Sequence, residues 1–152
     1  MDEQVSLLLD ALYSRSHAHD QAEPDRLKRW RNVEPDTARF MSALIRALAP
    51  RRLLELGTSN GYSTIWLAEA VRATGGFLTS VEIDPDRSAV AGEYLRRATL
   101  DQFVELRVQD AGEALANSED ESWDFIFLDA ERPAYPGYWP DLRRVLAPRG
   151  VL

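Results

Sequence analysis

The sequence of 152 residues contains no cysteine. This absence excludes disulfide bonds, thiolate zinc sites and cysteine nucleophiles. A chain without disulfides fits a reducing compartment, and we expect a cytoplasmic protein. The hydrophobic content of 45% is sufficient for a folded core at this length. We therefore expect one domain over residues 1–152.

Long apolar runs and clusters of positive charge are also missing. The apolar run from Val5 to Leu9 is too short, and its flank too acidic, for a signal peptide, and no segment approaches the length of a membrane span. The formal net charge of −7 argues against nucleic acid as a partner, because such binding needs a clustered basic face. The paired arginines are scattered and are expected at the solvated surface: Arg51-Arg52, Arg96-Arg97 and Arg143-Arg144.

The first part of the chain is predicted to be helical. Residues 16–25 lack apolar periodicity and predict a loop that separates an N-terminal helical hairpin from the rest. Residues 36–48 predict an amphipathic helix with Pro35 in its first turn. Its apolar face comprises Phe40, Met41, Leu44, Ile45 and Leu48. We expect residues 1–49 to form a helical cap on a core of residues 50–152.

Strands and helices alternate along the core. The expected strands are residues 51–56, 77–83, 103–108 and 123–129, and the expected helices are residues 62–71, 85–100, 111–117 and 134–146. This alternation predicts an α/β fold with a mostly parallel sheet and right-handed crossovers. The turn at residues 147–150 predicts a fifth strand, of which only Val151 and Leu152 are present. We therefore expect that the C-terminal strands are missing from this chain, or that it is an unusually short variant.

A glycine-containing turn follows the first strand of the core. Gly57 and Gly61 are spaced as Gly-x-x-x-Gly, which differs from the Gly-x-Gly-x-x-Gly of dinucleotide sites. Gly57 permits close approach to the main chain, and the helix start near Ser63 can hold a carboxylate. Glu55, in the strand, suits an amino group such as that of a methionine moiety. The alternative is a plain strand-to-helix turn.

Carboxylates also lie at or just after the ends of three later strands. Glu82 is placed to accept from ribose hydroxyls, while Asp84 is the better helix cap at Pro85. Asp110 could accept from an adenine amine or cap the next helix, and both roles are compatible. Asp129 ends a hydrophobic strand at the sheet edge where ligands bind, and it could serve a divalent cation, a cofactor or an acceptor.

These segments together resemble a known family. Glu55-Leu-Gly-Thr-Ser-Asn-Gly61-Tyr-Ser, Val-Glu82-Ile-Asp, and Asp-Phe-Ile-Phe-Leu-Asp129-Ala with Tyr135 downstream are similar to catechol and caffeoyl-coenzyme A O-methyltransferases, including bacterial members. The resemblance runs from about Val33 to the last residue. It implies the Rossmann-like class I methyltransferase fold with S-adenosylmethionine as cofactor.

The resemblance also implies roles for individual residues. The methionine part of the cofactor would be surrounded by residues of the first turn, Glu82 would bind the ribose, and Asp110 with Ala111 would lie by the adenine. The full set of implied cofactor-binding residues is Val33, Glu55, Gly57, Thr58, Ser59, Gly61, Ser63, Glu82, Asp110 and Ala111. Asp129 would be a metal ligand, for Mg²⁺ or another divalent cation, close to the transferred methyl group.

Two departures limit this comparison. Arg132 stands where the family commonly has a lysine proposed as general base; a guanidinium can orient an anion but cannot accept a proton. The family's other metal ligands, an Asp-Asn pair, would follow Leu152. Asp129 and Arg132 are therefore the candidate catalytic residues, with Asp129 an incomplete metal site in this chain.

The resulting prediction is an S-adenosylmethionine-dependent O-methyltransferase that acts on a small, phenolic hydroxyl acceptor. A non-catalytic or truncated cofactor-binding module is the alternative, and a nucleotide-dependent enzyme of another Rossmann class is the third reading. Family members are often dimers, so a homodimer is expected as a possible assembly.

Other polar and aromatic residues carry weaker signals. His17 and His19 are expected to be exposed to solvent. Four aromatic residues could border an aromatic acceptor, although their helical spacing favours core packing for at least half of them: Trp30, Tyr135, Tyr138 and Trp139.

Overall fold

The computed structural model describes all residues from Met1 to Leu152. Five strands form the sheet: β1 (Arg52–Leu56), β2 (Phe77–Glu82), β3 (Val104–Val108), β4 (Trp123–Leu128) and β5 (Leu146–Val151). The α-helices are α1 (Glu3–Ala22), α2 (Pro35–Leu48), α3 (Tyr62–Thr74), α4 (Pro85–Arg97), α5 (Ala111–Ala116) and α6 (Tyr135–Val145). Three short 3-10 helices are η1 (Arg26–Lys28), η2 (Asp101–Phe103) and η3 (Arg132–Ala134).

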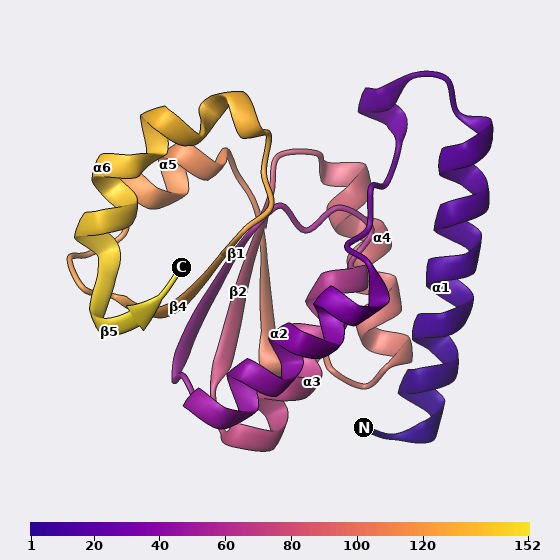
Figure 1. Ribbon diagram of the computed structural model, residues 1–152, viewed down its shortest axis with the longest axis horizontal. Helices are drawn as coiled ribbons and strands as arrows, with labels where there is room; N and C mark the ends of the chain where they lie inside the picture. The colour runs from indigo at the N-terminus through magenta and orange to yellow at the C-terminus, as the bar shows by residue number, and fades with distance from the viewer.

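The sheet has the order β3-β2-β1-β4-β5, and every neighbouring pair is parallel. Figure 1 shows α5 and α6 on one side of this sheet and the other helices on the opposite side. The predicted parallel α/β sheet flanked by helices is therefore confirmed.

Alternate residues of the central strands supply two cores, as the two-residue period of a strand requires. Leu53 and Phe125 belong to the larger cluster under α1, α2, α3 and α4, whereas Leu54 and Ile126 belong to the smaller cluster under α5 and α6. Both faces of the sheet are thus buried, which explains the nearly continuous apolar runs in β1 and β4.

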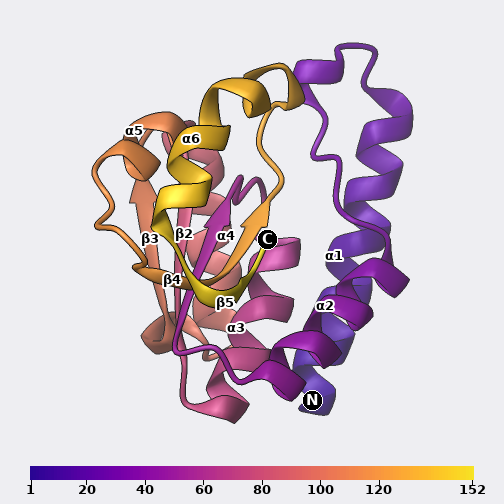
Figure 2. The same ribbon diagram turned by 60° about the vertical axis from the view of Figure 1, so that its left-hand side comes forward.

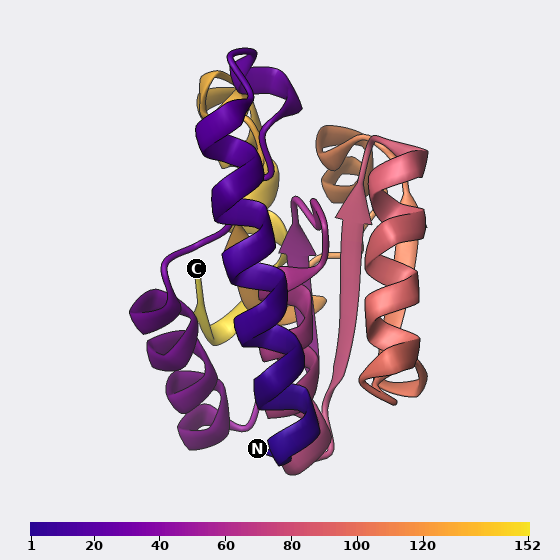
Figure 3. The ribbon, with the colours of Figure 1, turned by 90° about the vertical axis from the view of Figure 1, so that its right-hand side faces the viewer.

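The helix α1 corrects the prediction for residues 16–25. The helix continues to Ala22, so the N-terminal segment is one long helix and not a hairpin followed by a loop. In this part of the helix Ser16 is buried and the neighbouring side chains are exposed. The helical repeat of apolar residues by which a helix is predicted is therefore absent here. Figure 3 shows the full length of α1 in front of the sheet.

The strand β5 corrects the predicted start of the fifth strand, which begins at Leu146 and not at Val151. The helix α6 ends at Val145, and residues 146–151 pair with β4, with Trp123 opposite Leu146 and Phe125 opposite Val151. The register shifts between these pairs, because a turn-like Ala-Pro-Arg-Gly sequence occupies the strand. Figure 2 shows β5 at the edge of the sheet next to β4.

Surface predictions are largely confirmed. His17 and His19 are exposed, and at least one arginine of each predicted pair is exposed. On α2, however, Phe40 and Leu48 are exposed, whereas Met41 and Ile45 are buried, so the buried stripe is narrower than predicted. No helix is long and apolar enough to span a membrane.

Candidate active site

A cleft of about 480 Å³ opens at the carboxyl ends of β1 to β4. The position between β1 and β4 is where the strand order reverses, which is the usual ligand site of an open α/β sheet. A segment that links α1 to α2, residues 23–34, closes one side of the cleft; we call it the strap. The volume lies within the range of small-molecule sites.

The turn between β1 and α3 depends on Gly57. Its φ of +109° lies in the region that favours glycine, and a Cβ there would stand 2.5 Å from the carbonyl oxygen of Asp129. The nitrogen of Asp129 in turn donates to Leu56 O at 2.9 Å. The missing side chain of Gly57 therefore lets the ends of β1 and β4 meet at the floor of the cleft.

Glu55 points from β1 toward α3 and is completely buried. Its carboxylate accepts hydrogen bonds from the hydroxyls of Ser63 at 2.5 Å and of Thr64 and Ser80 at 2.6 Å. Burial raises the pKa of Glu55 to about 7, against the opposing effect of these three hydroxyls. Ser63 lines the cleft and Glu55 does not, so Glu55 lies one side chain behind the wall.

Glu82 ends β2 and lines the cleft with only 8% of its surface exposed. One carboxylate oxygen accepts from the nitrogen of Ser59 at 2.7 Å, and the other accepts from the nitrogen of Asp84 at 3.0 Å. A carboxylate has about four acceptor positions, so each oxygen can still accept from a hydroxyl group of a ligand. This is the arrangement that a ribose diol requires.

Asp84 and Asp110 are both helix caps. Asp84 accepts from the nitrogens of Asp86 and Arg87 at the start of α4, as the sequence predicted. Asp110 accepts from the nitrogen of Glu113 at the start of α5 and also lines the cleft, so its two predicted roles are structurally compatible. Next to them Ile83 is 67% exposed in the cleft wall and offers an apolar surface to a flat ring.

Asp129 marks the opposite end of the cleft. The recess limits hydration of its carboxyl group and raises its pKa to about 6, while the guanidinium groups of Arg31 and Arg132 oppose that shift. Arg31 forms an ion pair with Glu131 across the cleft mouth. This end therefore combines two carboxylates with two guanidinium groups.

The residues present do not fit a metal ion. No group of three or more His, Asp or Glu side chains is arranged to hold one. Asp129 is the only predicted ligand, the guanidinium groups of Arg31 and Arg132 lie near it, and the neighbouring carboxylate of Glu131 is paired with Arg31. A hard divalent cation needs several oxygen ligands, so no step of the chemistry below is assigned to a metal.

The cleft gathers most of the predicted cofactor residues. Its wall includes Val33, Gly57, Thr58, Ser59, Ser63, Glu82, Asp110 and Ala111, together with Asp129 and Arg132. Glu55 and Gly61 lie outside the wall; Gly61 has a φ of +88° and packs against Ala91. Whether the residues in the wall touch a cofactor stays a prediction.

The strap supplies wall residues that sequence reasoning missed: Arg26, Leu27, Arg31 and Asn32. Arg87 of α4 and Asn60 of the first turn were also missed. The strap has no periodic pattern of apolar residues from which it could be predicted, because η1 is its only regular element. The position of the strap depends on contacts with residues distant in sequence.

The aromatic residues divide into two pairs. Trp30 and Tyr138 line the cleft. Tyr135 lies outside the wall and its hydroxyl donates to the carbonyl oxygens of Leu128 and Ala130, while Trp139 is 53% exposed. Core packing therefore does not account for Trp139.

Several known proteins are similar to this chain in sequence, in fold or in both. A catechol O-methyltransferase of Niastella koreensis is 36% identical over 120 residues, which are 77% of this chain and 54% of the relative. An O-methyltransferase of Bacillus cereus, solved in complex with SAH, superposes with a TM-score of 0.71 at 31% identity over 88% of this chain and 59% of that one. An O-methyltransferase of Streptomyces achromogenes involved in tomaymycin synthesis, solved in complex with SAM, has a TM-score of 0.70 at 28% identity over 93% and 59%.

These matches also show what this sequence covers. The chain spans about half the length of the curated relatives it matches. The fold is that of the S-adenosylmethionine-dependent O-methyltransferases among its structural neighbours. A profile described as O-methyltransferase matches residues 20–152, and on that match, which includes every strand of the sheet and all of the cleft, the chain belongs to the O-methyltransferase family.

Proposed function

We propose that this chain binds S-adenosylmethionine in the cleft and that the protein transfers the methyl group to the hydroxyl oxygen of a small phenolic molecule. The observation that carries the proposal is the convergence of Gly57, Glu82 and Asp129 on one cleft at the switch point of the sheet. Structures of related O-methyltransferases in complex with SAH and SAM support it.

The cofactor would extend along the cleft from Asp110 to Asp129. The free acceptor positions of Glu82 suit the two ribose hydroxyls, and Ile83 with Ala111 offers apolar surface to the adenine. The start of α3 at Ser63 suits the carboxylate of the methionine part, since helix N-termini attract anions. The side-chain nitrogen of Asn32 is buried without a hydrogen-bond partner at the same cleft and could donate to a ligand.

The reaction is an in-line displacement. The bond from sulfur to the methyl carbon breaks as the bond from the acceptor oxygen to that carbon forms, S-adenosylhomocysteine is the leaving group, and the proton of the acceptor hydroxyl is released to solvent water. Because the sulfonium is already an activated donor, the protein contributes mainly position and exclusion of water. Asp129 would hold the acceptor hydroxyl near the methyl group, and Arg132 would orient an oxygen anion without accepting the proton.

A cofactor-binding module without catalysis is the second candidate. The absence of three or more His, Asp or Glu side chains arranged to hold a metal favours it for this chain. A dinucleotide-dependent reaction lacks comparable support, because Gly57 and Gly61 do not form the dinucleotide spacing.

Transfer of a labelled methyl group tests the proposal directly. The chain would be incubated with methyl-labelled S-adenosylmethionine and catechol, and the product would be separated and counted. We expect labelled methoxyphenol from the native chain and from Asp101→Asn, an exposed control, but not from Asp129→Asn. Cofactor binding without any labelled product would favour the module.

A further inference from the structure

The strap has little regular structure of its own. Within it only η1 is helical, with Lys28 and Arg29 donating to the carbonyl oxygens of Asp25 and Arg26. Leu27 is 70% exposed, so burial of this side chain cannot fix the segment. The strap nevertheless forms one wall of the cleft, which requires attachment from outside.

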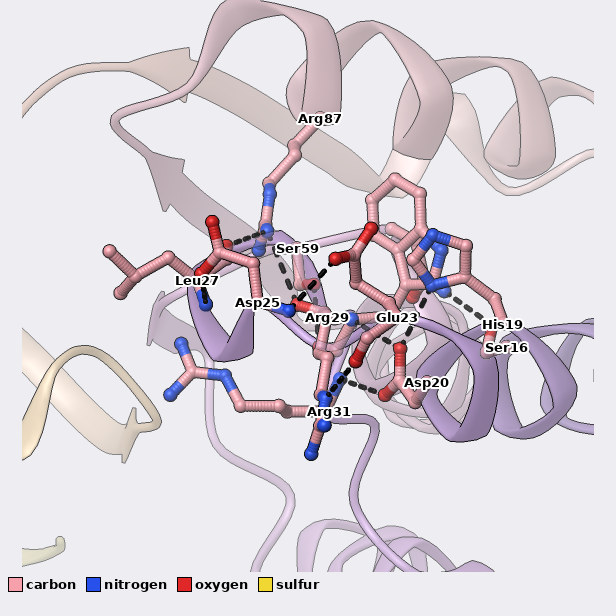
Figure 4. A network of polar contacts seen from close by, with 12 residues as sticks. Ser16, His19, Asp20, Glu23, Asp25, Leu27, Arg29, Arg31, Ser59 and Arg87 are labelled. Atoms are coloured by element: carbon pink, nitrogen blue, oxygen red, sulfur yellow. Dashed lines mark hydrogen bonds and ion pairs between the residues drawn. The ribbon is translucent and has the colours of Figure 1, made fainter.

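Arg87 of α4 provides such an attachment. Its guanidinium donates to the carbonyl oxygen of Leu27 at 2.7 Å and to that of Arg29 at 3.2 Å, and it lies 5.3 Å from the centre of the Trp30 ring. Hydrogen bonds from a charged donor are stronger than neutral ones. Figure 4 shows this side chain reaching from α4 to the strap.

The other side of the strap is held by α1. Asp20 accepts hydrogen bonds at 2.8 Å from the nitrogens of Trp30 and Arg31, and Ser59 donates to the carbonyl oxygen of Trp30 at 2.9 Å. Trp30 is therefore bonded through both of its backbone groups, to α1 and to the first turn of the core.

The guanidinium of Arg87 is directed mainly at the protein itself. Its side chain is only 17% exposed, one terminal nitrogen is bonded to both carbonyl oxygens, and its Nε lies 3.8 Å from Asp84. The strap thus uses both donors of one terminal nitrogen, and the Nε faces the Asp84 carboxylate at ion-pair distance. From its position in the cleft wall, Arg87 therefore binds the backbone of the strap.

We propose that Arg87 is a positioning residue that fastens the strap over the cleft and thereby slows release of the bound nucleoside. The identity of the nucleoside rests on the proposed function, whereas the fastening of the strap does not. Loss of Arg87 would free the strap to open locally while the sheet and its two cores stay folded.

Limited proteolysis measures strap opening without any ligand. The strap contains four trypsin sites, after Arg26, Lys28, Arg29 and Arg31. We expect Arg87→Ala to be cut at these sites about tenfold faster than the native chain, because two charge-assisted hydrogen bonds are lost. Arg87→Lys, which keeps the charge and can reach one carbonyl, should fall between them.

Arg97→Ala is the matched control. Arg97 lies on the same helix and also stacks on an aromatic ring, that of Tyr94 at 5.3 Å, but it does not contact the strap. Equal cleavage of Arg87→Ala and Arg97→Ala would overturn the proposal. Faster cleavage spread evenly over all trypsin sites would overturn it as well, because it would indicate general unfolding.

Release of S-adenosylhomocysteine provides the second measurement. We expect its dissociation rate constant, measured by stopped-flow fluorescence, to rise about tenfold in Arg87→Ala at an unchanged melting temperature. Faster strap cleavage with an unchanged dissociation rate would refute the positioning role. If the native chain binds no S-adenosylhomocysteine, the proposed function fails, and the proteolysis still decides whether Arg87 fastens the strap.

Discussion

At Gly57 a hydrogen atom in place of a side chain allows the ends of β1 and β4 to meet. We expect Gly57→Ala to destabilise the chain by about 1–3 kcal/mol, because the new Cβ would meet the Asp129 carbonyl at an unfavourable φ. Thermal denaturation measures the effect. Gly137→Ala is the control. Gly137 lies in α6, and a Cβ added there would have no neighbouring atom within 4 Å, so alanine should stabilise the chain by about 0.5–1 kcal/mol. A Gly57→Ala variant as stable as the native chain would contradict the predicted clash.

Glu55 should make stability depend on pH near neutrality. Its pKa is raised to about 7 in the folded chain, so its stabilising contribution is complete below the unfolded pKa, near 4.5, and is lost as pH rises through about 7. The shift corresponds to a loss on the order of 3 kcal/mol between pH 5 and pH 8.

Urea denaturation at several pH values checks this prediction for Glu55. The native chain should lose more stability than Glu55→Gln over that interval, because glutamine does not titrate and can still accept from the surrounding hydroxyls. Identical pH profiles for the two proteins would rule out an elevated pKa for Glu55.

For single residues, the sequence predicted which side chains lie near the site better than it predicted what those side chains contact. Glu82 is the last residue of β2 and Asp129 follows β4, and both strands are recognisable from the sequence, so the place of these residues at the sheet edge could be predicted. Glu55 was expected to face the ligand, but three hydroxyls hold it behind Ser63, and which side of a turn a buried carboxylate faces depends on packing. Arg87 could not be found in advance, because its partners are the carbonyl oxygens of a distant segment.

Among the elements, β1 and β4 are joined at their amino ends by a side chain. Asp124 accepts from the nitrogens of Arg51 at 3.0 Å and Arg52 at 2.8 Å, far from the cleft, and pairs with the Arg52 guanidinium at 3.0 Å. We expect Asp124→Ala to lower the free energy of unfolding by about 1–2 kcal/mol and to leave ligand affinity unchanged. Arg52→Ala should cost less, since its ion pair is exposed.

The contribution of Asp124 to the free energy of unfolding should also decrease at acidic pH. Desolvation alone would raise the pKa of Asp124, but hydrogen bonds from Arg52 and Arg51 outweigh it and hold the pKa below its ordinary value. Its contribution is therefore present above the unfolded pKa and lost as pH falls through the lower folded pKa. Chemical denaturation of the native chain and Asp124→Ala from pH 7 downward measures this. A stability difference that persists in strong acid would contradict the assigned cause.

The element predictions succeeded where periodicity was strong. The helix α3 and the strands β1 to β4 were placed within a few residues, since their apolar positions repeat clearly. The end of α1 was missed because a polar, mostly exposed helix surface has no such repeat. A fifth strand was predicted, but its start at Leu146 was missed because pairing with β4 overrides the local turn preference of residues 147–150.

For the whole molecule, the arrangement of charge is informative. The net charge is −7, yet the cleft mixes its carboxylates with Arg26, Arg31, Arg87 and Arg132. Carboxylates dominate the end near Glu82 and Asp110, while guanidinium groups flank Asp129. Such a cleft suits a ligand with hydroxyl groups at one end and mixed charge at the other, as in S-adenosylmethionine.

Calorimetric titration with S-adenosylhomocysteine, with NAD as the control ligand, tests this central claim most directly. Saturable binding of S-adenosylhomocysteine but not of NAD is expected, weakened about 10- to 100-fold by Glu82→Gln through lost hydrogen bonds to the ribose. Glu93→Gln, an exposed change on α4, should bind as the native chain does. A folded chain that binds NAD, or that binds neither ligand, would contradict the account.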